Sequence, residues 1–156
     1  MANVKLTELP ALTTTDDATD VLAVVDVSAN ATKKISVANL VTAQARTYTA
    51  AQRGEITTLT DAASISIDLA ASNNFAVVLA GNRTLANPSN IVAGQSGSIF
   101  ISQDGTGSRT LAYGSYYDFA GGTAPTLSTA ASSVDRIDYL VRSSTSIHCV
   151  FTANYS

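Results

Sequence analysis

His148 and Cys149 are the first residues to consider for chemistry, because the chain contains one histidine and one cysteine. They are neighbours in a stretch of alternating apolar and polar residues, which is typical of a β-strand and directs successive side chains to opposite faces. The two side chains therefore cannot bind one metal ion together. Because Cys149 alternates with Ile147 and Phe151, we predict a buried, unreactive thiol and an outward-facing His148.

Two glycine-rich segments have compositions close to those of catalytic or phosphate-binding loops. Residues 94–98 (GQSGS) approach the nucleophile-elbow pattern, but Ser98 stands at the position of its second glycine and no helical pattern follows. Residues 105–107 (GTG) lack the third glycine and the helix of a phosphate-binding loop. We therefore interpret both segments as turns, with residues 104–107 at the tip of a β-hairpin.

Asp135 and Asp138 are the candidates for acid–base catalysis, because a pair of carboxylates can cleave a glycosidic bond. On a strand, however, their spacing places them on opposite faces, and Arg136 and Arg142 share the face of Asp138. Charge pairing on the sheet surface is the simpler explanation. We therefore expect no enzymatic activity and no cofactor, and a small glycan depolymerase that uses the two aspartates is the catalytic alternative.

An aromatic cluster accompanies a long segment of the C-terminal part, residues 114–131, which by its composition is the best candidate for a functional loop. Such side chains can stack on sugar rings or anchor a protein interface, and they can equally close the end of a β-sandwich. Among the intermolecular roles, a subunit contact is favoured over a ligand site. The aromatic residues are Tyr113, Tyr116, Tyr117 and Phe119.

Composition excludes several classes of protein. The 156 residues carry a net charge of −3 with a pI near 4.8, and the nine basic residues are scattered, so we expect no nucleic-acid partner. One cysteine cannot build a disulfide scaffold. We also expect no contact with a membrane, because no apolar run approaches the ~20 residues of a spanning helix and no secretory leader opens the chain.

The elements that must position these residues are strands. Residues 55–156 alternate apolar and polar side chains in six or seven short segments separated by glycine-rich turns, with no helical period. This pattern predicts an all-β head domain over residues 55–156, built as an antiparallel β-sandwich or jelly roll.

Residues 1–54 read as an N-terminal arm. Strand-like runs at 21–27 and 33–37 predict a β-hairpin, and residues 37–46 favour a short helix. Residues 1–30 hold five acidic residues and one lysine, whereas residues 31–54 hold four basic residues and no acid. These charges either lie on the solvated faces of a hairpin or form an acidic end that docks on a basic patch of a partner.

Three segments of the arm carry a resemblance to known proteins. Residues 7–10 (TELP), 20–27 (DVLAVVDV) and 32–40 (TKKISVANL) resemble the N-terminal segment of many virion proteins of tailed bacteriophages. Residues 73–113, with GNRTL at 81–85 and GQSG at 94–97, are similar to a β-module of phage fibre and capsid-surface proteins. This second likeness continues through GGTAPTLS at 121–128 and the last strands.

The resemblance implies a virion structural protein that assembles as a homotrimer, made in the host cytoplasm and located on the capsid surface or the tail. Fibres generally need many hundreds of residues, so an arm with a compact head fits a capsid decoration (cement) protein bound to the major capsid protein or another virion protein. The alternative is a short tail fibre or receptor-binding head that recognises a host glycan.

The resemblance also suggests where contacts form. The loop aromatics would then lie near the trimer axis or at the outer tip. The expected contacts of the arm are Leu22, Val24, Val27, Lys33 and Lys34.

Overall fold

The computed structural model describes residues 21–26, 31–36 and 49–155. The chain divides into two compact units, Met1–Ala51 and Gln52–Ser156, with the boundary close to the one that the sequence predicts after residue 54. Residues 49–55, where the units join, are exposed. No helix in the described ranges is long and apolar enough to cross a membrane.

The described part of the first unit contains two strands, β1 (Val21–Asp26) and β2 (Ala31–Ser36), which pair antiparallel. Their register places Val24 opposite Lys33 and Ala23 opposite Lys34. Leu22, another expected contact of the arm, pairs with Ile35. The expected contact Val27 and the helical stretch predicted over 37–46 lie outside the described residues.

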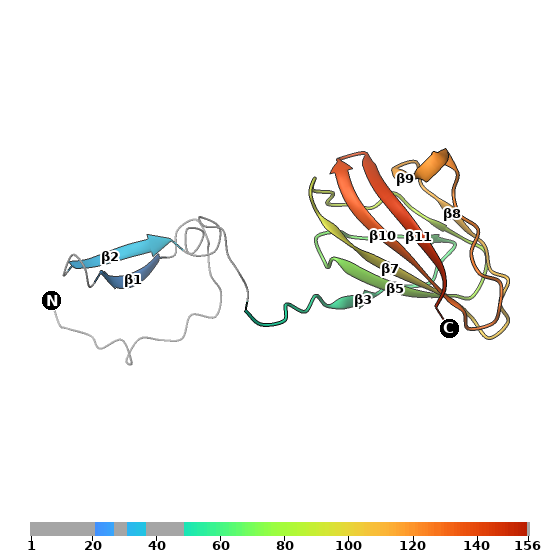
Figure 1. Ribbon diagram of the computed structural model, residues 1–156, viewed down its shortest axis with the longest axis horizontal. Coiled ribbons are helices and arrows are strands. Elements are labelled where there is room, and N and C mark those ends of the chain that lie inside the picture. The colour runs from blue at the N-terminus through green and yellow to red at the C-terminus, as the bar shows by residue number, and fades with distance from the viewer. Residues whose placement is uncertain (1–20, 27–30, 37–48, 156) are drawn as a thin grey trace. The chain divides into compact units, whose positions relative to one another are not determined.

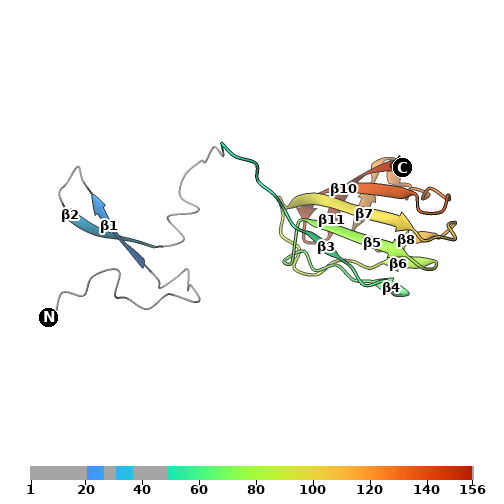
Figure 2. The same cartoon turned by 90° about the horizontal axis from the view of Figure 1, so that it is seen from below.

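The second unit consists of strands arranged in two sheets, which can be followed in Figures 1 and 2. The larger sheet has the order β3-β5-β7-β10-β11-β9, and the smaller has the order β4-β6-β8. A 3-10 turn, η2 (Ala120–Gly122), follows β9. The strands are β3 (Ile56–Thr58), β4 (Ser64–Ile65), β5 (Asn74–Leu79), β6 (Arg83–Leu85), β7 (Ser96–Gln103), β8 (Leu111–Tyr113), β9 (Tyr117–Phe119), β10 (Val134–Ser143) and β11 (Ser146–Tyr155).

From β3 to β8 the chain alternates between the two sheets, and each strand pairs with the preceding strand of the same sheet. Paired strands are therefore parallel, and residues at corresponding positions of neighbouring strands form rows across each sheet. In the larger sheet Thr57, Phe75 and Ile99 form one row. In the smaller sheet the corresponding row joins Ile65 to Leu85 and Tyr113.

The prediction of an all-β unit is confirmed, but the prediction that it is antiparallel is wrong for most of the sheet pairs. Antiparallel pairing in this unit is confined to β7–β10–β11, which Figure 1 shows side by side. The β3–β5–β7, β4–β6–β8 and β9–β11 pairs are parallel. Parallel neighbours need long crossover connections, and here the short strands of the opposite sheet provide them. Alternation along one strand is identical in both arrangements, so it could not distinguish them.

The predicted hairpin at residues 104–107 is also wrong, because β7 and β8 belong to different sheets. The segment is a loop that the carboxylate of Asp104 organises. It accepts hydrogen bonds from the backbone N–H groups of Thr106 (3.0 Å) and Gly107 (2.9 Å) and forms an ion pair with Arg109 (2.8 Å). The hydrogen bond from Arg109 is the main reason that the pKa of Asp104 falls to about 2.

One apolar core fills the space between the sheets. It contains Ile65 and Leu85 from the smaller sheet together with Phe75, Ile99 and Ile137 from the larger one. Each lies at an inward position of the alternation, so burial of these side chains removes one whole face of each sheet from water.

Ile137 tests this core, because it lies on central strand β10 and is fully buried. We expect Ile137→Ala to lower the free energy of unfolding by about 2–5 kcal/mol, since truncation leaves a cavity that the packed sheets cannot close. Val92→Ala, at a position that is exposed, should change it by less than ~0.5 kcal/mol. Denaturant unfolding followed by circular dichroism measures both, and equal losses would contradict the assigned core.

Candidate functional site

Three aromatic rings gather at β8 and β9, which are edge strands of the smaller and the larger sheet. The ring of Tyr113 lies 4.8 Å from that of Phe119 and 6.1 Å from that of Tyr117, measured between centroids. The interplanar angles of 65° and 62° are edge-to-face geometry, which places the positive edge of one ring against the negative face of another. The cluster is therefore a packed unit and not a set of separate loop side chains.

The backbone positions this cluster through β9 and the turn before it. Strand β9 is parallel to β11, and the N–H of Ile147 donates to the carbonyl of Tyr116 (2.8 Å). The amide oxygen of Asn87 accepts from the N–H of Tyr116 (3.0 Å). At Gly114 a Cβ atom would lie 2.2 Å from that same amide oxygen, so the close approach of the turn to Asn87 requires glycine.

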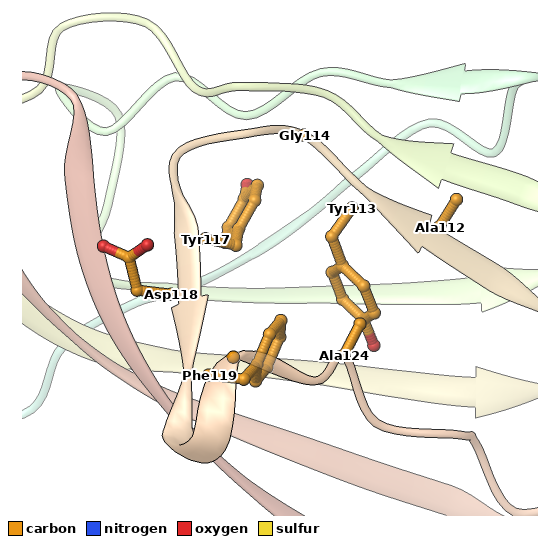
Figure 3. Close-up of a pocket in the computed structure, with 8 residues that line it drawn as sticks. Ala112, Tyr113, Gly114, Tyr117, Asp118, Phe119 and Ala124 are labelled. Atoms are coloured by element: carbon orange, nitrogen blue, oxygen red, sulfur yellow. The ribbon is translucent and has the colours of Figure 1, made fainter.

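A hollow of about 350 Å³ opens beside the rings (Figure 3). Figure 3 shows the rings of Tyr113 and Phe119 on one side of β9 and the carboxylate of Asp118 on the other. Asp118 accepts a hydrogen bond from the hydroxyl of Ser146 (2.6 Å). The residues that line the hollow are Ala112, Tyr113, Gly114, Tyr117, Asp118, Phe119, Gly122 and Ala124.

The two tyrosine hydroxyls of the cluster differ in their partners. The hydroxyl of Tyr117 donates to the carbonyl of Ala86 (3.1 Å), whereas the buried hydroxyl of Tyr113 has no hydrogen-bond partner in the described part of the chain. Burial raises the pKa of both phenols well above its ordinary value, and the carboxylate of Asp135 raises that of Tyr113 further. Both are therefore neutral phenols at physiological pH.

The four predicted loop aromatics thus divide into two groups. Tyr117 is buried and belongs to the core, whereas Tyr113, Tyr116 and Phe119 are half-buried and pack against it. Of these, Tyr113 and Phe119 line the hollow. The cluster closes the end of the unit and also leaves two ring surfaces beside an open space.

The predictions for Cys149 and His148 are confirmed. Cys149 is buried on the core side of β11, and burial raises the pKa of its thiol to about 12. His148 is exposed on the other face, where it pairs in register with Leu140 on β10 and with Asp118 on β9.

Asp135 is buried on the inward face of β10 and holds two segments together. Its carboxylate accepts hydrogen bonds from the N–H and the hydroxyl of Ser128, both at 2.7 Å. It also accepts from the N–H of Asn154 (2.8 Å), at a bulge where the register of β10 and β11 shifts. These donors occupy the carboxylate in a structural role.

Asp138 points away from the core on the outward face of the same strand, so the two aspartates lie on opposite faces, as the sequence predicts. Its carboxylate pairs with Arg136 (2.8 Å) and accepts a hydrogen bond from the hydroxyl of Ser98 (2.6 Å). Asp135 and Asp138 therefore cannot flank one glycosidic bond.

Sequence reasoning missed the outer face of the larger sheet, which turns away from the core. Five of the six large apolar side chains that are exposed in the described residues lie at outward positions of this sheet. The sequence did contain a signal for this face, because apolar residues stand at positions of the strand alternation that polar residues usually occupy. The five are Ile56, Val78, Leu140, Val150 and Tyr155.

Comparison of the chain with known protein families, with curated proteins and with solved structures finds no match. The described ranges contain no group of three or more His, Cys, Asp or Glu side chains placed to hold a metal ion. Two surfaces remain as candidate sites, the aromatic hollow and the outer face of the larger sheet.

Tyr113 and Tyr117 provide a matched test of the cluster. We expect Tyr113→Phe to raise the free energy of unfolding by about 1 kcal/mol, because it removes a buried hydroxyl that lacks a partner. Tyr117→Phe should lower it by about 1 kcal/mol, because the hydrogen bond to Ala86 is lost. Urea denaturation of the two variants measures both changes. A loss in Tyr113→Phe as large as that in Tyr117→Phe would contradict the assignment.

Proposed function

We propose that this chain is a structural protein of a tailed-phage virion, a homotrimeric capsid decoration protein that binds the assembled shell and stabilises it. The arm and head segments that resemble phage virion proteins support this proposal. The division into an N-terminal unit and a compact β unit also suits it, with the first as the attachment arm and the second as a sandwich-like head.

The outer face of the larger sheet is the observation that carries the proposal. Side chains such as Leu140 and Val150 are at least half exposed there, although their type is usually buried. Five of the six large apolar side chains that are exposed in the described residues lie on this one face, and such a concentration indicates an interaction site. A subunit whose work is to bind other subunits explains such a face, whereas an isolated soluble domain would gain from polar residues at these positions.

Decoration stabilises a shell by mass action. A protein that binds the assembled shell but not its dissociated subunits stabilises the shell by RT ln(1 + [L]/Kd) for each site, and the effect is repeated over every site of the lattice. In the proposal the arm makes the contact to the shell, with Lys33 and Lys34 of β2 in register with Val24 and Ala23 of β1.

Purified protein should therefore co-sediment with emptied phage heads and raise their melting temperature. The double variant Lys33→Glu/Lys34→Glu should bind roughly tenfold more weakly, because two interfacial charge contacts reverse their sign. Val92→Glu, which places a negative charge at an exposed position off the larger sheet, is the control and should bind like the wild type. If the wild-type protein does not co-sediment at any ratio, the capsid proposal is wrong.

The aromatic hollow favours a second candidate function, recognition of a host glycan by a short fibre or receptor-binding head. Its volume is in the range that holds small ligands, and the surfaces of aromatic rings suit the faces of sugars. The half-buried rings of Tyr113 and Phe119 would provide the stacking surface.

Under this alternative, Phe119→Ala should weaken binding on a glycan array about tenfold through loss of ring contact, and Ala124→Trp should block the hollow. Val92→Ala, at an exposed position outside the hollow, should leave binding unchanged. Binding that survives both substitutions in the hollow, or no binding by the wild type to any glycan or host cell, would remove this candidate.

A further inference from the structure

The outward rows of the larger sheet combine apolar and paired polar residues. One row runs from Ile56 on β3 across Asn74, Ser98 and Asp138 to Val150 on β11. A second row joins Val78, Ser102, Val134 and Tyr155. The exposed apolar residues therefore lie on β3, β5, β10 and β11, with polar residues such as Ser98 and Asp138 between them.

The charges at the centre of this face are already paired. Arg136 and Asp138 lie side by side on β10, 2.8 Å apart, and Ser98 donates to the same aspartate. The guanidinium of Arg136 also lies 5.0 Å from the ring centre of Tyr155, within the range of a cation–π contact. The bulge at Asn154 shifts the register by one residue and so brings Tyr155 to this face.

The face has a suitable size for a protein interface. Its six strands hold on the order of 40 residues, which at ~3.3 Å per residue and ~4.8 Å between strands cover roughly 600 Å². Standard interfaces bury about 600–1,000 Å² on each partner. Neither a short peptide nor a small ligand would cover a flat surface of this area.

We propose that this face packs against the same chain in a second copy, and that in the trimer it faces the common axis. Leu140 and Val150, on the adjacent strands β10 and β11, form the apolar part of the contact beside the Arg136–Asp138 pair, and Val78 lies in another row of the same face. Because Arg136 and Asp138 neutralise each other within one chain, two copies can approach without bringing an unpaired charge into the contact. This inference rests on the self-association in the proposed function and assigns the surface that carries it.

The composition of the arm argues against the arm as the segment that covers the outer face of the larger sheet. Residues 1–30 carry Glu8, Asp16, Asp17, Asp20 and Asp26 against one lysine. An acidic segment needs unpaired cations opposite it, whereas Arg136, the cation at the centre of the face, is already bound to Asp138.

The first measurement is the mass in solution, by light scattering coupled to size exclusion. The wild type should have about three times the 16.1 kDa of one chain, and Leu140→Glu/Val150→Glu should have the mass of one chain, since two buried carboxylates per copy would lack partners. Val92→Glu is the control, because Val92 is an exposed valine off the larger sheet, and it should remain trimeric. Circular dichroism shows whether each variant is folded.

A second measurement does not disturb the contact. Val150 and Val92 are 66% and 65% exposed in the single chain, so cysteines at the two positions should react equally with a maleimide unless assembly covers one of them. We expect Val150→Cys in the full-length protein to react at least ~10-fold more slowly than Val92→Cys. The native Cys149 adds little background, because it is buried and its pKa is raised to about 12.

The outcomes separate this inference from the proposed function. An oligomeric wild type whose Leu140→Glu/Val150→Glu variant keeps its mass, or whose two cysteines react alike, overturns the assigned face and leaves decoration intact. A monomeric wild type overturns the face and the homotrimer together. A wild type that is trimeric through this face but does not bind emptied heads supports the interface and contradicts decoration of the capsid.

Discussion

Burial of one inward row across the larger sheet is the interaction on which the rest of the β unit depends. Phe75, Ile99 and Ile137 are register partners on β5, β7 and β10, and all three are almost fully buried against the smaller sheet. Because side chains on a strand alternate, fixing this row inward determines the direction of every neighbouring residue. A shift of one residue would expose the core and bury Ser98 and Asp138.

The same row therefore creates the outer face. Once Ile137 points inward, Arg136 and Asp138 must point outward, and Leu140 follows them. The core explains why these residues share a surface, but it does not require that Leu140 or Val150 be apolar. Their exposure is a cost in solubility, which the proposed self-association would remove.

Polar side chains hold the connections between the sheets through hydrogen bonds to backbone groups. Gln103 is buried, and its amide both accepts from the N–H of Arg109 (2.7 Å) and donates to the carbonyl of the same residue (2.9 Å). Asp135 fixes the Ser128 segment and the bulge near the C-terminus in a similar way. A chain with 13% charged residues can therefore order long loops, because its short polar groups bond directly to backbone.

The sequence by itself determined the all-β class, the inward direction of Cys149, the outward direction of His148 and the opposite faces of Asp135 and Asp138. All of these depend on alternation within one strand, which is local. Only the tertiary structure decided which strands are neighbours. It alone therefore revealed the parallel pairing of β3–β5–β7 and β4–β6–β8, the burial of Tyr117, the hollow beside Phe119 and the exposed apolar residues of the outer face. Strand pairing is set by where distant segments bury their apolar sides together, and a period of two along the chain is the same whether the neighbouring strand runs parallel or antiparallel.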